Sequence, residues 1–374
     1  MDKMNVSKLM VLLIMVGVLT GLRLQGEYLN VGSDPEKIKV VSTQIISVPW
    51  EGDGYRFKGW SPDGEFFAVA RRDEISPDEA KNKKRADETM VFTKEGQLYK
   101  KFSGAAILWS PDSTSILLIF GKDEFRLQNI KTDQSLKFCP TFMSSLDRYR
   151  ERFVVDFVQA TGNLIYYRQN EIFEYDFSTG KSKLIYTAPG RWIHDLKFIP
   201  DTLFFSVKVK NEALLYRYDL KNNFIKKIFP HDISAVYYFT SKLDQQIIYF
   251  YSNVNDYIYF IDGDGKNLFE VKYFLVDRTG NRSDEYINLE FTSFAPNGKL
   301  FAATLGKFTE KVDEVISADV YLFNLSGKMA KLTKTVDRME LVSGWSPQGN
   351  QFIYFENKEK KYYLLTLTVI KKRL

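Results

Sequence analysis

A short turn motif recurs along this chain, and it constrains the fold more than any other feature. Each copy has an aromatic residue, a tight turn and then an apolar run of strand-forming residues. In the first copy, Pro62 sets φ for the first turn position, Asp63 suits the second, and Gly64 supplies the left-handed conformation that reverses the chain. The clear copies begin at Trp60, Trp109, Phe198, Phe294 and Trp345. These internal repeats indicate a repeat protein.

A second hairpin with a Gly or Asn turn follows the apolar strand of most copies. It spans 172–186, 214–229, 257–272 and 320–333. Each repeat is therefore predicted to be a four-stranded antiparallel unit: an aromatic-ended strand, a turn, an apolar strand and a closing hairpin. Two degenerate copies, around Phe157 and Phe239, keep the aromatic residue and the apolar run but lack the Pro-Asp turn.

Counting the degenerate copies gives seven repeats, which predicts an all-β, seven-bladed β-propeller. The spacing between marker aromatics runs from 41 residues (Phe157 to Phe198) to 55 residues (Phe239 to Phe294). Propeller blades take about 40 to 45 residues, so the longer intervals require inserted loops. We expect these loops at Asp73–Glu88, Cys139–Arg152, Asp277–Glu285 and Lys307–Ser317. Six or eight blades remain as alternatives.

The last repeat is one strand short, and a strand near the N-terminus has no partner close in sequence. The last repeat offers Glu340–Trp345, Gln351–Phe355 and Tyr362–Thr368, and Ile38–Val48 is the unpartnered strand. We expect this strand to complete the last blade, because closure of the ring removes exposed sheet edges.

Composition agrees with a large β-sheet core and excludes several classes of protein. The 374 residues are 44% hydrophobic and 15% aromatic, which is too apolar for a disordered chain. Lys and Arg number 52 against 47 Asp and Glu, so the surface is mixed in charge and no nucleic-acid partner is predicted. Cys139 is the single cysteine and excludes an intramolecular disulfide.

The N-terminal region has the pattern of a targeting segment. Leu9 to Leu22 is apolar apart from Thr20, with Lys8 before it and Arg23 after it. Fourteen residues are short for a membrane helix and typical of a signal-peptide core. Residues 1–26 are therefore interpreted as a signal peptide or a membrane anchor, 27–37 as a linker and 38–374 as the propeller. The predicted location is extracytoplasmic: periplasmic, secreted or membrane-anchored.

The Trp-Ser-Pro-Asp-Gly turn, its apolar strand and the hairpin Tyr257–Asn267 resemble the TolB-type, WD40-like propeller repeat. The resemblance extends over Ile38–Leu374 and concerns architecture rather than function. Propellers of this type are found in periplasmic binding proteins, in the N-terminal domains of prolyl-oligopeptidase-like peptidases and in polysaccharide lyases.

The resemblance favours a binding protein over an enzyme. A peptidase of that kind needs a Gly-x-Ser-x-Gly nucleophile elbow, which the sequence lacks. The lyases need a cluster of histidines for a metal, and this chain has only His194 and His231. We expect a non-enzymatic binding or scaffolding propeller without a cofactor, engaging a protein, peptide or small ligand at the channel mouth or a disc face. A channel hydrolase or lyase using Asp195 and Asp232, and a structural cell-envelope component, remain as alternatives.

Two His-Asp pairs mark the candidate ligand site in neighbouring repeats. The predicted ligand-binding residues are Arg191, Trp192, His194, Asp195, His231 and Asp232. First strands line a propeller channel, so these residues are expected at one mouth, where they could bind a carboxylate or a peptide. The alternative is that each Asp caps a turn and each His packs on the surface. Two histidines without a third ligand do not predict a metal site.

Three further features have structural interpretations. Asp262-Gly263-Asp264-Gly265 resembles the opening of a calcium loop but lacks the later ligands, so a hairpin turn is predicted. The repeated tryptophans are predicted to lie in the core between blades. The basic residues at 371–373 could touch an anionic membrane, although three charges alone bind weakly. The other predicted membrane contact is association through the N-terminus.

Overall fold

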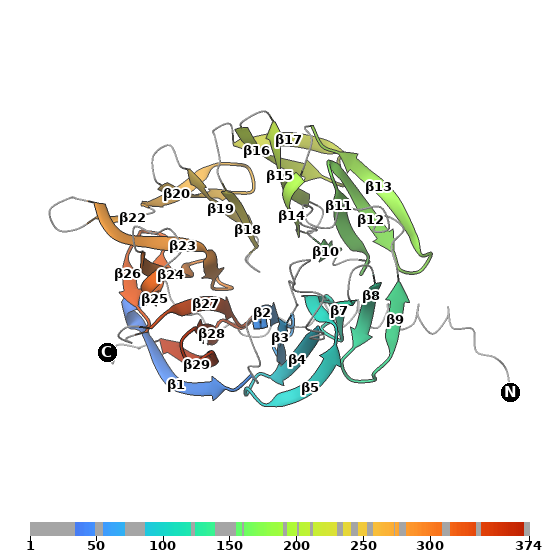
Figure 1. The fold of residues 1–374 in the computed structure, drawn as a ribbon. Coiled ribbons are helices and arrows are strands. Elements are labelled where there is room, and N and C mark those ends of the chain that lie inside the picture. The colour runs from blue at the N-terminus through green and yellow to red at the C-terminus, as the bar shows by residue number, and fades with distance from the viewer. Residues whose placement is uncertain are drawn as a thin grey trace, which may run out of the picture.

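The computed structural model is a ring of antiparallel sheets (Figure 1). It describes residues 34–48, 55–71, 87–120, 124–138, 155–158, 161–189, 193–199, 202–209, 212–229, 235–240, 246–252, 257–272, 274–276, 282–308, 315–333 and 338–369. Within these residues the strands form seven sheets, the number of repeats counted in the sequence. We call each sheet a blade and number the blades from the first complete repeat.

Strand bounds follow the repeat closely in the first four blades. Blade one contains β2 (Tyr55–Trp60), β3 (Phe66–Arg71), β4 (Glu88–Thr93) and β5 (Leu98–Ser103). Blade two contains β6 (Ala105–Trp109), β7 (Ser115–Phe120), β8 (Glu124–Asn129) and β9 (Ser135–Phe138). Blade three contains β10 (Val155–Phe157), β11 (Leu164–Arg168), β12 (Glu171–Asp176) and β13 (Lys181–Thr187). Blade four contains β14 (Ile193–Ile199), β15 (Thr202–Val209), β16 (Glu212–Asp219) and β17 (Phe224–Phe229).

The remaining blades complete the ring. Blade five contains β18 (Ala235–Thr240), β19 (Gln246–Ser252), β20 (Tyr257–Asp262) and β21 (Asn267–Lys272). Blade six contains β22 (Phe274–Val276), β23 (Arg282–Phe294), β24 (Leu300–Phe308), β25 (Val315–Asn324) and β26 (Met329–Lys331). Blade seven contains β27 (Glu340–Trp345), β28 (Gln351–Glu356), β29 (Lys361–Val369) and β1 (Ile38–Ile46), which a single 3-10 turn, η1 (Pro35–Lys37), precedes.

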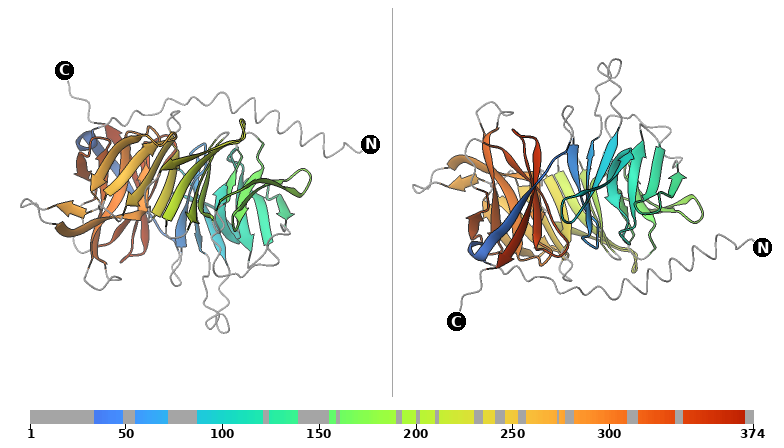
Figure 2. Two further views of the ribbon diagram at one scale, coloured as in Figure 1. Left: turned by 90° about the horizontal axis from the view of Figure 1, so that it is seen from above. Right: turned by 90° about the horizontal axis from the view of Figure 1, so that it is seen from below.

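The blades stand radially about a central axis, and the ring forms a disc (Figures 1 and 2). Each blade places its first repeat strand nearest the centre and its last strand at the rim. The prediction of an all-β propeller built of four-stranded antiparallel blades is confirmed, with blade six as an exception.

The ring closes through β1, as the sequence predicted. β1 pairs antiparallel with β29 in a register that sets Ile38 opposite Val369 and Ile46 opposite Tyr362, with a bulge at Val41. The first described strand of the chain is therefore the outermost strand of the last blade. Ile46 joins a buried cluster with Trp60 of blade one, so closure also seals the core between these two blades.

Blade six corrects the prediction of an inserted loop at Asp277–Glu285. Residues 282–285 instead begin the long strand β23, and β22 pairs with it through Phe274–Tyr286 and Val276–Arg282. The apolar triplet 274–276 followed by a turn-forming Gly-Asn sequence suits a hairpin. The predicted insertion at Lys307–Ser317 is shorter than expected, because β24 and β25 extend into it from both sides. Cys139–Arg152 lies outside the described residues.

The repeated tryptophans join neighbouring blades, as predicted. Trp60, Trp109 and Trp345 are all buried. The Trp109 indole Nε1 donates to the Gly59 carbonyl of blade one at 3.0 Å, and that of Trp345 donates to the Ser293 carbonyl of blade six at 3.2 Å. A buried indole N–H needs an acceptor. Each of these two tryptophans therefore fixes its blade against the preceding one.

The turn motif owes its shape to its own serine and aspartate. Ser61 Oγ donates to Asp63 Oδ1 at 2.6 Å and accepts from the backbone N–H of Phe66 at 3.0 Å. Gly64 has a φ of 72°, where a glycine avoids the strain that a Cβ would bring. Ser110 and Asp112 repeat the same contact in blade two at 2.5 Å.

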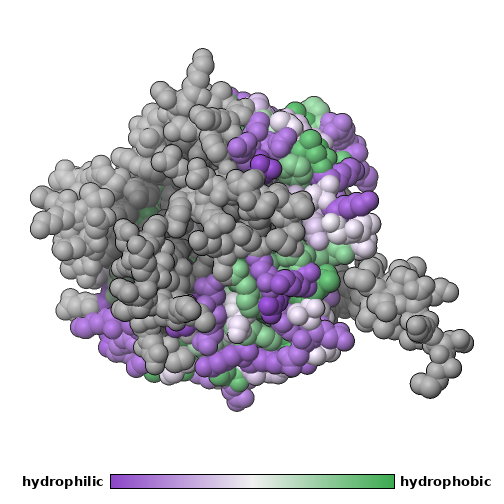
Figure 3. Space-filling view, turned by 45° about the vertical axis from the view of Figure 1, so that its right-hand side comes forward, coloured by the Kyte–Doolittle hydropathy of each residue, from purple (hydrophilic) through white to green (hydrophobic). Residues whose placement is uncertain are grey.

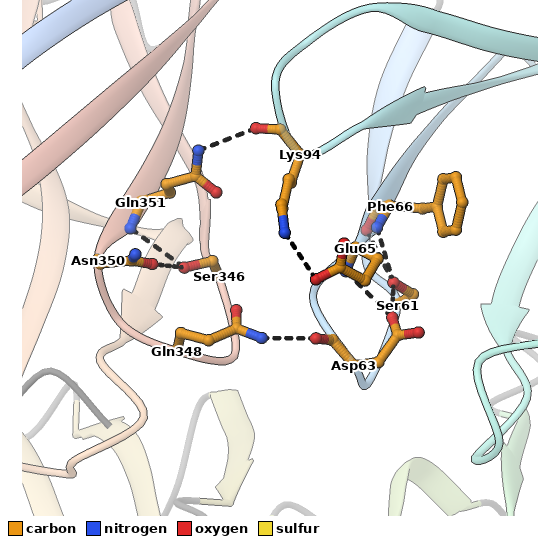
Figure 4. A network of polar contacts seen from close by, with 9 residues as sticks. All are labelled: Ser61, Asp63, Glu65, Phe66, Lys94, Ser346, Gln348, Asn350 and Gln351. Atoms are coloured by element: carbon orange, nitrogen blue, oxygen red, sulfur yellow. Dashed lines mark hydrogen bonds and ion pairs between the residues drawn. The ribbon is translucent and has the colours of Figure 1, made fainter. Parts of the chain in front are cut away.

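At the closure seam, the junction of blades seven and one, two turns meet directly (Figure 4). Gln348 Nε2 donates to the Asp63 carbonyl at 2.5 Å, and Gln351 Nε2 donates to the Lys94 carbonyl at 2.9 Å. The Gln348 amide fills the space that a Cβ at Gly64 would occupy. Residues 285 positions apart are thus joined by side-chain to backbone hydrogen bonds in addition to the β1–β29 ladder.

Gly64→Ala should destabilise the protein by more than Gly162→Ala. Both glycines have positive φ, which costs an alanine about 1 to 2 kcal/mol, but only Gly64 faces a neighbouring side chain. Urea unfolding of the two variants measures the difference. Adding Gln348→Ala should recover part of the Gly64→Ala loss, and an equal loss for both glycines would contradict a tight seam.

Candidate functional site

The order of the strands divides the ring into two unlike faces. Because the strands of each blade alternate in direction, the links from first to second and from third to fourth strand lie on one face, here the turn face. The links from second to third strand, and from one blade to the next, lie on the other, here the connection face.

The hydrogen-bonding groups of the turn face are largely used within their own turns. Asp176 accepts from the Ser178 N–H at 2.7 Å and from its hydroxyl at 2.6 Å, and the hydroxyl bond is the main reason that the pKa of Asp176 is lowered. Asp219 accepts from the Asn222 N–H at 2.9 Å, which lowers the pKa of Asp219 in the same way. These carboxylates stabilise hairpins.

The Asp262 turn is also a hairpin rather than a cation loop. Asp262 Oδ1 accepts from the N–H groups of Asp264 and Lys266, each at 2.9 Å. Asp264 in turn forms an ion pair with Arg217 of blade four at 2.5 Å. The predicted hairpin interpretation of this segment is therefore confirmed.

The connection face receives the long links of the chain. Residues 72–87 join β3 to β4, 139–154 join β9 to β10, and 309–314 join β24 to β25. Apart from Asp87, all three segments lie outside the described residues. Their flanking strand ends place their points of departure on the connection face, whereas the described links of the turn face are short.

Of the six predicted ligand residues, the structure describes only the backbone of two, on a strand that begins at this face. His194 and Asp195 lie in the first half of β14, the innermost strand of blade four, and nothing is described of their side chains. Arg191 and Trp192 precede that strand, and His231 and Asp232 precede β18; all four lie outside the described residues. Their common site therefore stays a prediction.

His194 occupies a β-bulge, which sequence reasoning missed. The ladder pairs Ile193 with Val207 and Asp195 with Ser206, so His194 has no direct partner on β15. Three other innermost strands have a bulge two residues before the marker tryptophan, at Lys58, Ile107 and Ser343. In blade four the bulge at His194 lies four residues before the marker residue Phe198. Bulges re-aim side chains and are frequent beside functional sites, but no turn residue in the sequence marks this one.

A polar cluster that sequence reasoning also missed lies at the connection-face end of blade seven. Glu340 of β27 and Glu356 of β28 are cross-strand partners, and both are buried. Glu356 accepts from the N–H groups of Lys358 at 2.9 Å and Glu359 at 2.6 Å. It thereby holds the turn that links β28 to β29. In the sequence these glutamates look like ordinary charges at strand ends.

Glu359 presents this cluster to solvent. Its carboxylate pairs with Arg338 at 2.9 Å and Lys361 at 3.2 Å, and it accepts from the Tyr363 hydroxyl at 3.1 Å. The hydrogen bond from Lys361 is the largest reason that the pKa of Glu359 is lowered. The cluster is therefore charged at neutral pH, with two cations and a carboxylate on the surface.

Two stacked tyrosines lie beside the cluster. The rings of Tyr354 and Tyr363 are 5.0 Å apart and nearly parallel. Burial, reinforced by the nearby Glu340 charge, raises the pKa of Tyr354, so its hydroxyl keeps its proton at neutral pH. The arrangement can exchange hydrogen bonds and ion pairs with a ligand, but nothing in it forms a nucleophile-base pair.

The described residues contain neither a metal-binding cluster nor a membrane-spanning helix. No three His, Cys, Asp or Glu side chains in this part of the chain are placed to hold a metal ion. No helix in the same residues is long and apolar enough to cross a membrane. The predicted targeting segment at 1–26 lies outside them.

Comparison with known proteins identifies the fold alone. No family model matches the sequence, and no curated protein matches it significantly. The WD40 repeats of RRP9 align over 88% of this chain and 99% of their own, with a TM-score of 0.58 and 10% identity. The β-propeller domain of Cps50 (Swd1) from Myceliophteria thermophila covers 87% of this chain and 99% of its own, also with a TM-score of 0.58 and 10% identity.

Oligogalacturonate lyase from Vibrio parahaemolyticus is similar to the same extent. It covers 88% of this chain and 97% of its own, with a TM-score of 0.58 and 10% identity. Such low identities show a shared propeller of the WD40-like and TolB-like kind and leave the activity open.

Glu356→Ala should destabilise the protein by about 1 to 3 kcal/mol, because two backbone N–H groups of the turn lose the buried carboxyl group that accepts from them. Glu359→Ala removes surface ion pairs and the hydrogen bond from the Tyr363 hydroxyl, and should lower the free energy of unfolding by at most about 1 kcal/mol. Urea denaturation at neutral pH compares the two. A larger loss of unfolding free energy for Glu359→Ala would show that the surface charges, and not the hydrogen bonds to Glu356, stabilise the link between β28 and β29.

Proposed function

We propose that this chain is an exported, non-enzymatic binding propeller that engages a protein or peptide partner at its connection face. One observation carries the proposal: the longest links of the chain depart from strand ends on this face, and β14, which contains His194 and Asp195, begins there, whereas the turn face consists of short, internally hydrogen-bonded turns. Variable links on a rigid frame are where propellers and other scaffolds place their binding sites.

The chemistry of the predicted residues supports a peptide or carboxylate ligand. Arg191 offers a planar, bidentate donor for a carboxylate, and Trp192 offers a flat apolar surface. His194 and Asp195 stand on an innermost strand, at a bulge that changes the course of that strand. The interblade tryptophans and the closure seam join blades one, two, six and seven, and so hold closed the ring to which blade four belongs.

A photo-reactive amino acid at position 192 tests the proposed face. Cross-linking in intact cells should give one discrete protein adduct from this position. The matched control is the same substitution at Asn223, an exposed turn-face residue between β16 and β17. Once the partner is purified, Arg191→Ala should weaken its binding about tenfold, the loss of one interface anchor. Adducts from position 223 alone would refute the assignment of the face.

A channel lyase is the second candidate, because oligogalacturonate lyases, one of them in complex with manganese, share the fold. Asp195 and Asp232 would be the carboxylates of such a site, and a glycosidase would need them about 5 to 9 Å apart. Incubating the full chain with oligogalacturonate, with and without manganese, separates the two proposals. Formation of an unsaturated product that Asp195→Asn abolishes would replace the binding function with an enzymatic one.

A structural role in the cell envelope is the third candidate. It would place the protein in a large, stable envelope assembly without an exchangeable ligand. Gentle extraction followed by size-exclusion chromatography distinguishes this role from a binding propeller, which should elute free or with one partner.

A further inference from the structure

Large exposed apolar side chains gather at the rim of the ring. Within the described residues every large hydrophobic side chain that is well exposed lies on the outermost strand of a blade. These residues are Val41, Ile45, Leu98, Tyr99, Leu136, Leu184, Phe224, Leu268 and Met329. Scattered apolar residues need no explanation, but a restriction to edge strands does.

The distribution around the rim is uneven. β1 carries two of these residues, Val41 at 61% and Ile45 at 51% exposure, and β5 carries two more, Leu98 at 50% and Tyr99 at 43%. Each of the other five outermost strands carries one. In Figure 3, which brings the side of β9 and β13 forward, hydrophobic residues are interspersed with hydrophilic ones.

β1 and β5 lie end to end along one edge of the disc, on either side of the closure seam (Figure 1). Gly96, in the turn before β5, packs against the end of β1: a Cβ there would be 2.9 Å from Gln44 Nε2 and 3.3 Å from Ile46. The two strands therefore form one continuous surface. We call it the seam rim and define it as Lys39, Val41, Ile45, Leu98, Tyr99 and Lys101.

The seam rim is basic as well as apolar. β1 and β5 contain Lys39, Lys100 and Lys101 and no acidic residue. Lys100 pairs with Asp133, whereas Lys39 and Lys101 are exposed and form no ion pair within the described residues. Glu95, in the turn before β5, and Asp133 are exposed acids beside them. Lysines alone protect edge strands from aggregation, but that role does not account for four exposed apolar residues between them.

The two ends of the propeller meet at the same edge. Ile38, where β1 begins, is opposite Val369, where β29 ends. The apolar segment 9–22 is joined to the propeller at the first of these points, and the basic residues 371–373 follow the second. Stable attachment to a bilayer takes two signals, such as an apolar chain and a basic patch. Closure of the ring sets the described residues nearest to both segments, Ile38 and Val369, opposite each other.

We propose that the seam rim lies against an anionic phospholipid bilayer in which the N-terminal apolar segment is retained as an anchor. Aliphatic and tyrosine side chains enter the headgroup region, and Lys39 and Lys101 contact lipid phosphates. The disc then stands edge-on, which leaves both of its faces open to solvent. This inference depends on the segment at 9–22 and not on the partner proposed for the connection face.

Fluorescent labels on the full chain test the orientation. In a Cys139→Ser background, single cysteines replace Val41, Leu98, Leu184 or Phe224; the last two, on β13 and β17, are matched controls. Each labelled protein is reconstituted into vesicles of phosphatidylglycerol and phosphatidylcholine, or of phosphatidylcholine alone, that carry a headgroup quencher. Labels at 41 and 98 should be quenched in the anionic vesicles, and labels at 184 and 224 should stay bright.

Charge reversal then tests the mechanism. The test is the double variant Lys39→Glu with Lys101→Glu. It should lower the ratio of propellers whose seam rim contacts the bilayer to those whose seam rim does not by more than about fivefold for each lysine, since one basic residue near an anionic surface contributes about 1 kcal/mol. Lys183→Glu on β13 is the matched control and should change nothing. Unchanged thermal melting confirms that the variants fold. Equal quenching at all four labels, equal quenching in neutral vesicles, or failure to associate with anionic vesicles would each overturn the proposal.

Discussion

The antiparallel ladder between β1 and β29 is the interaction on which the rest of the molecule depends. Without it, blade seven would be a three-stranded sheet with an open edge, and Ile46 would leave the buried cluster that it shares with Trp60, Ile353 and Tyr362. The ladder joins residues more than 300 positions apart in sequence, from Ile38 to Val369. Such non-local pairing is slow to form. The seam hydrogen bonds of Gln348 and Gln351 join blade seven to blade one and add to the stability of the closed ring.

The two faces of the closed ring differ in how their polar side chains are used. On the turn face, serine, aspartate and asparagine side chains are used up in shaping short turns, and an interblade ion pair such as Arg217–Asp264 adds to this framework. On the connection face, strand ends lead into long links, and the buried Glu356 holds the last of the described turns there. A framework of short turns on one face and long links on the other is an arrangement that scaffolds use to carry binding sites.

The sequence predicted the architecture because its information is repeated. The turn at Trp60 recurs, so an error in one copy is corrected by the others, and the unpartnered strand at Ile38 followed from counting. The hairpin of β22 and β23 occurs once, and it was therefore mistaken for a loop. The pairing of Glu340 with Glu356 depends on the register between two strands. The bulge at His194 depends on the local geometry of one strand. A pattern of residue types predicts neither. The six ligand residues remain predictions, because Arg191, Trp192, His231 and Asp232 lie outside the described residues and only the backbone of His194 and Asp195 is described.

The position of β1 has a mechanical consequence. A pull on the N-terminal side of the chain acts at Ile38, the end of β1 that meets Val369, and would separate the ladder one hydrogen bond after another rather than all at once. Unzipping of this kind needs less force than sliding the strands past each other. Tension would therefore open the ring at blade seven while the other blades, whose outermost strands are each continuous with a hairpin, stay intact.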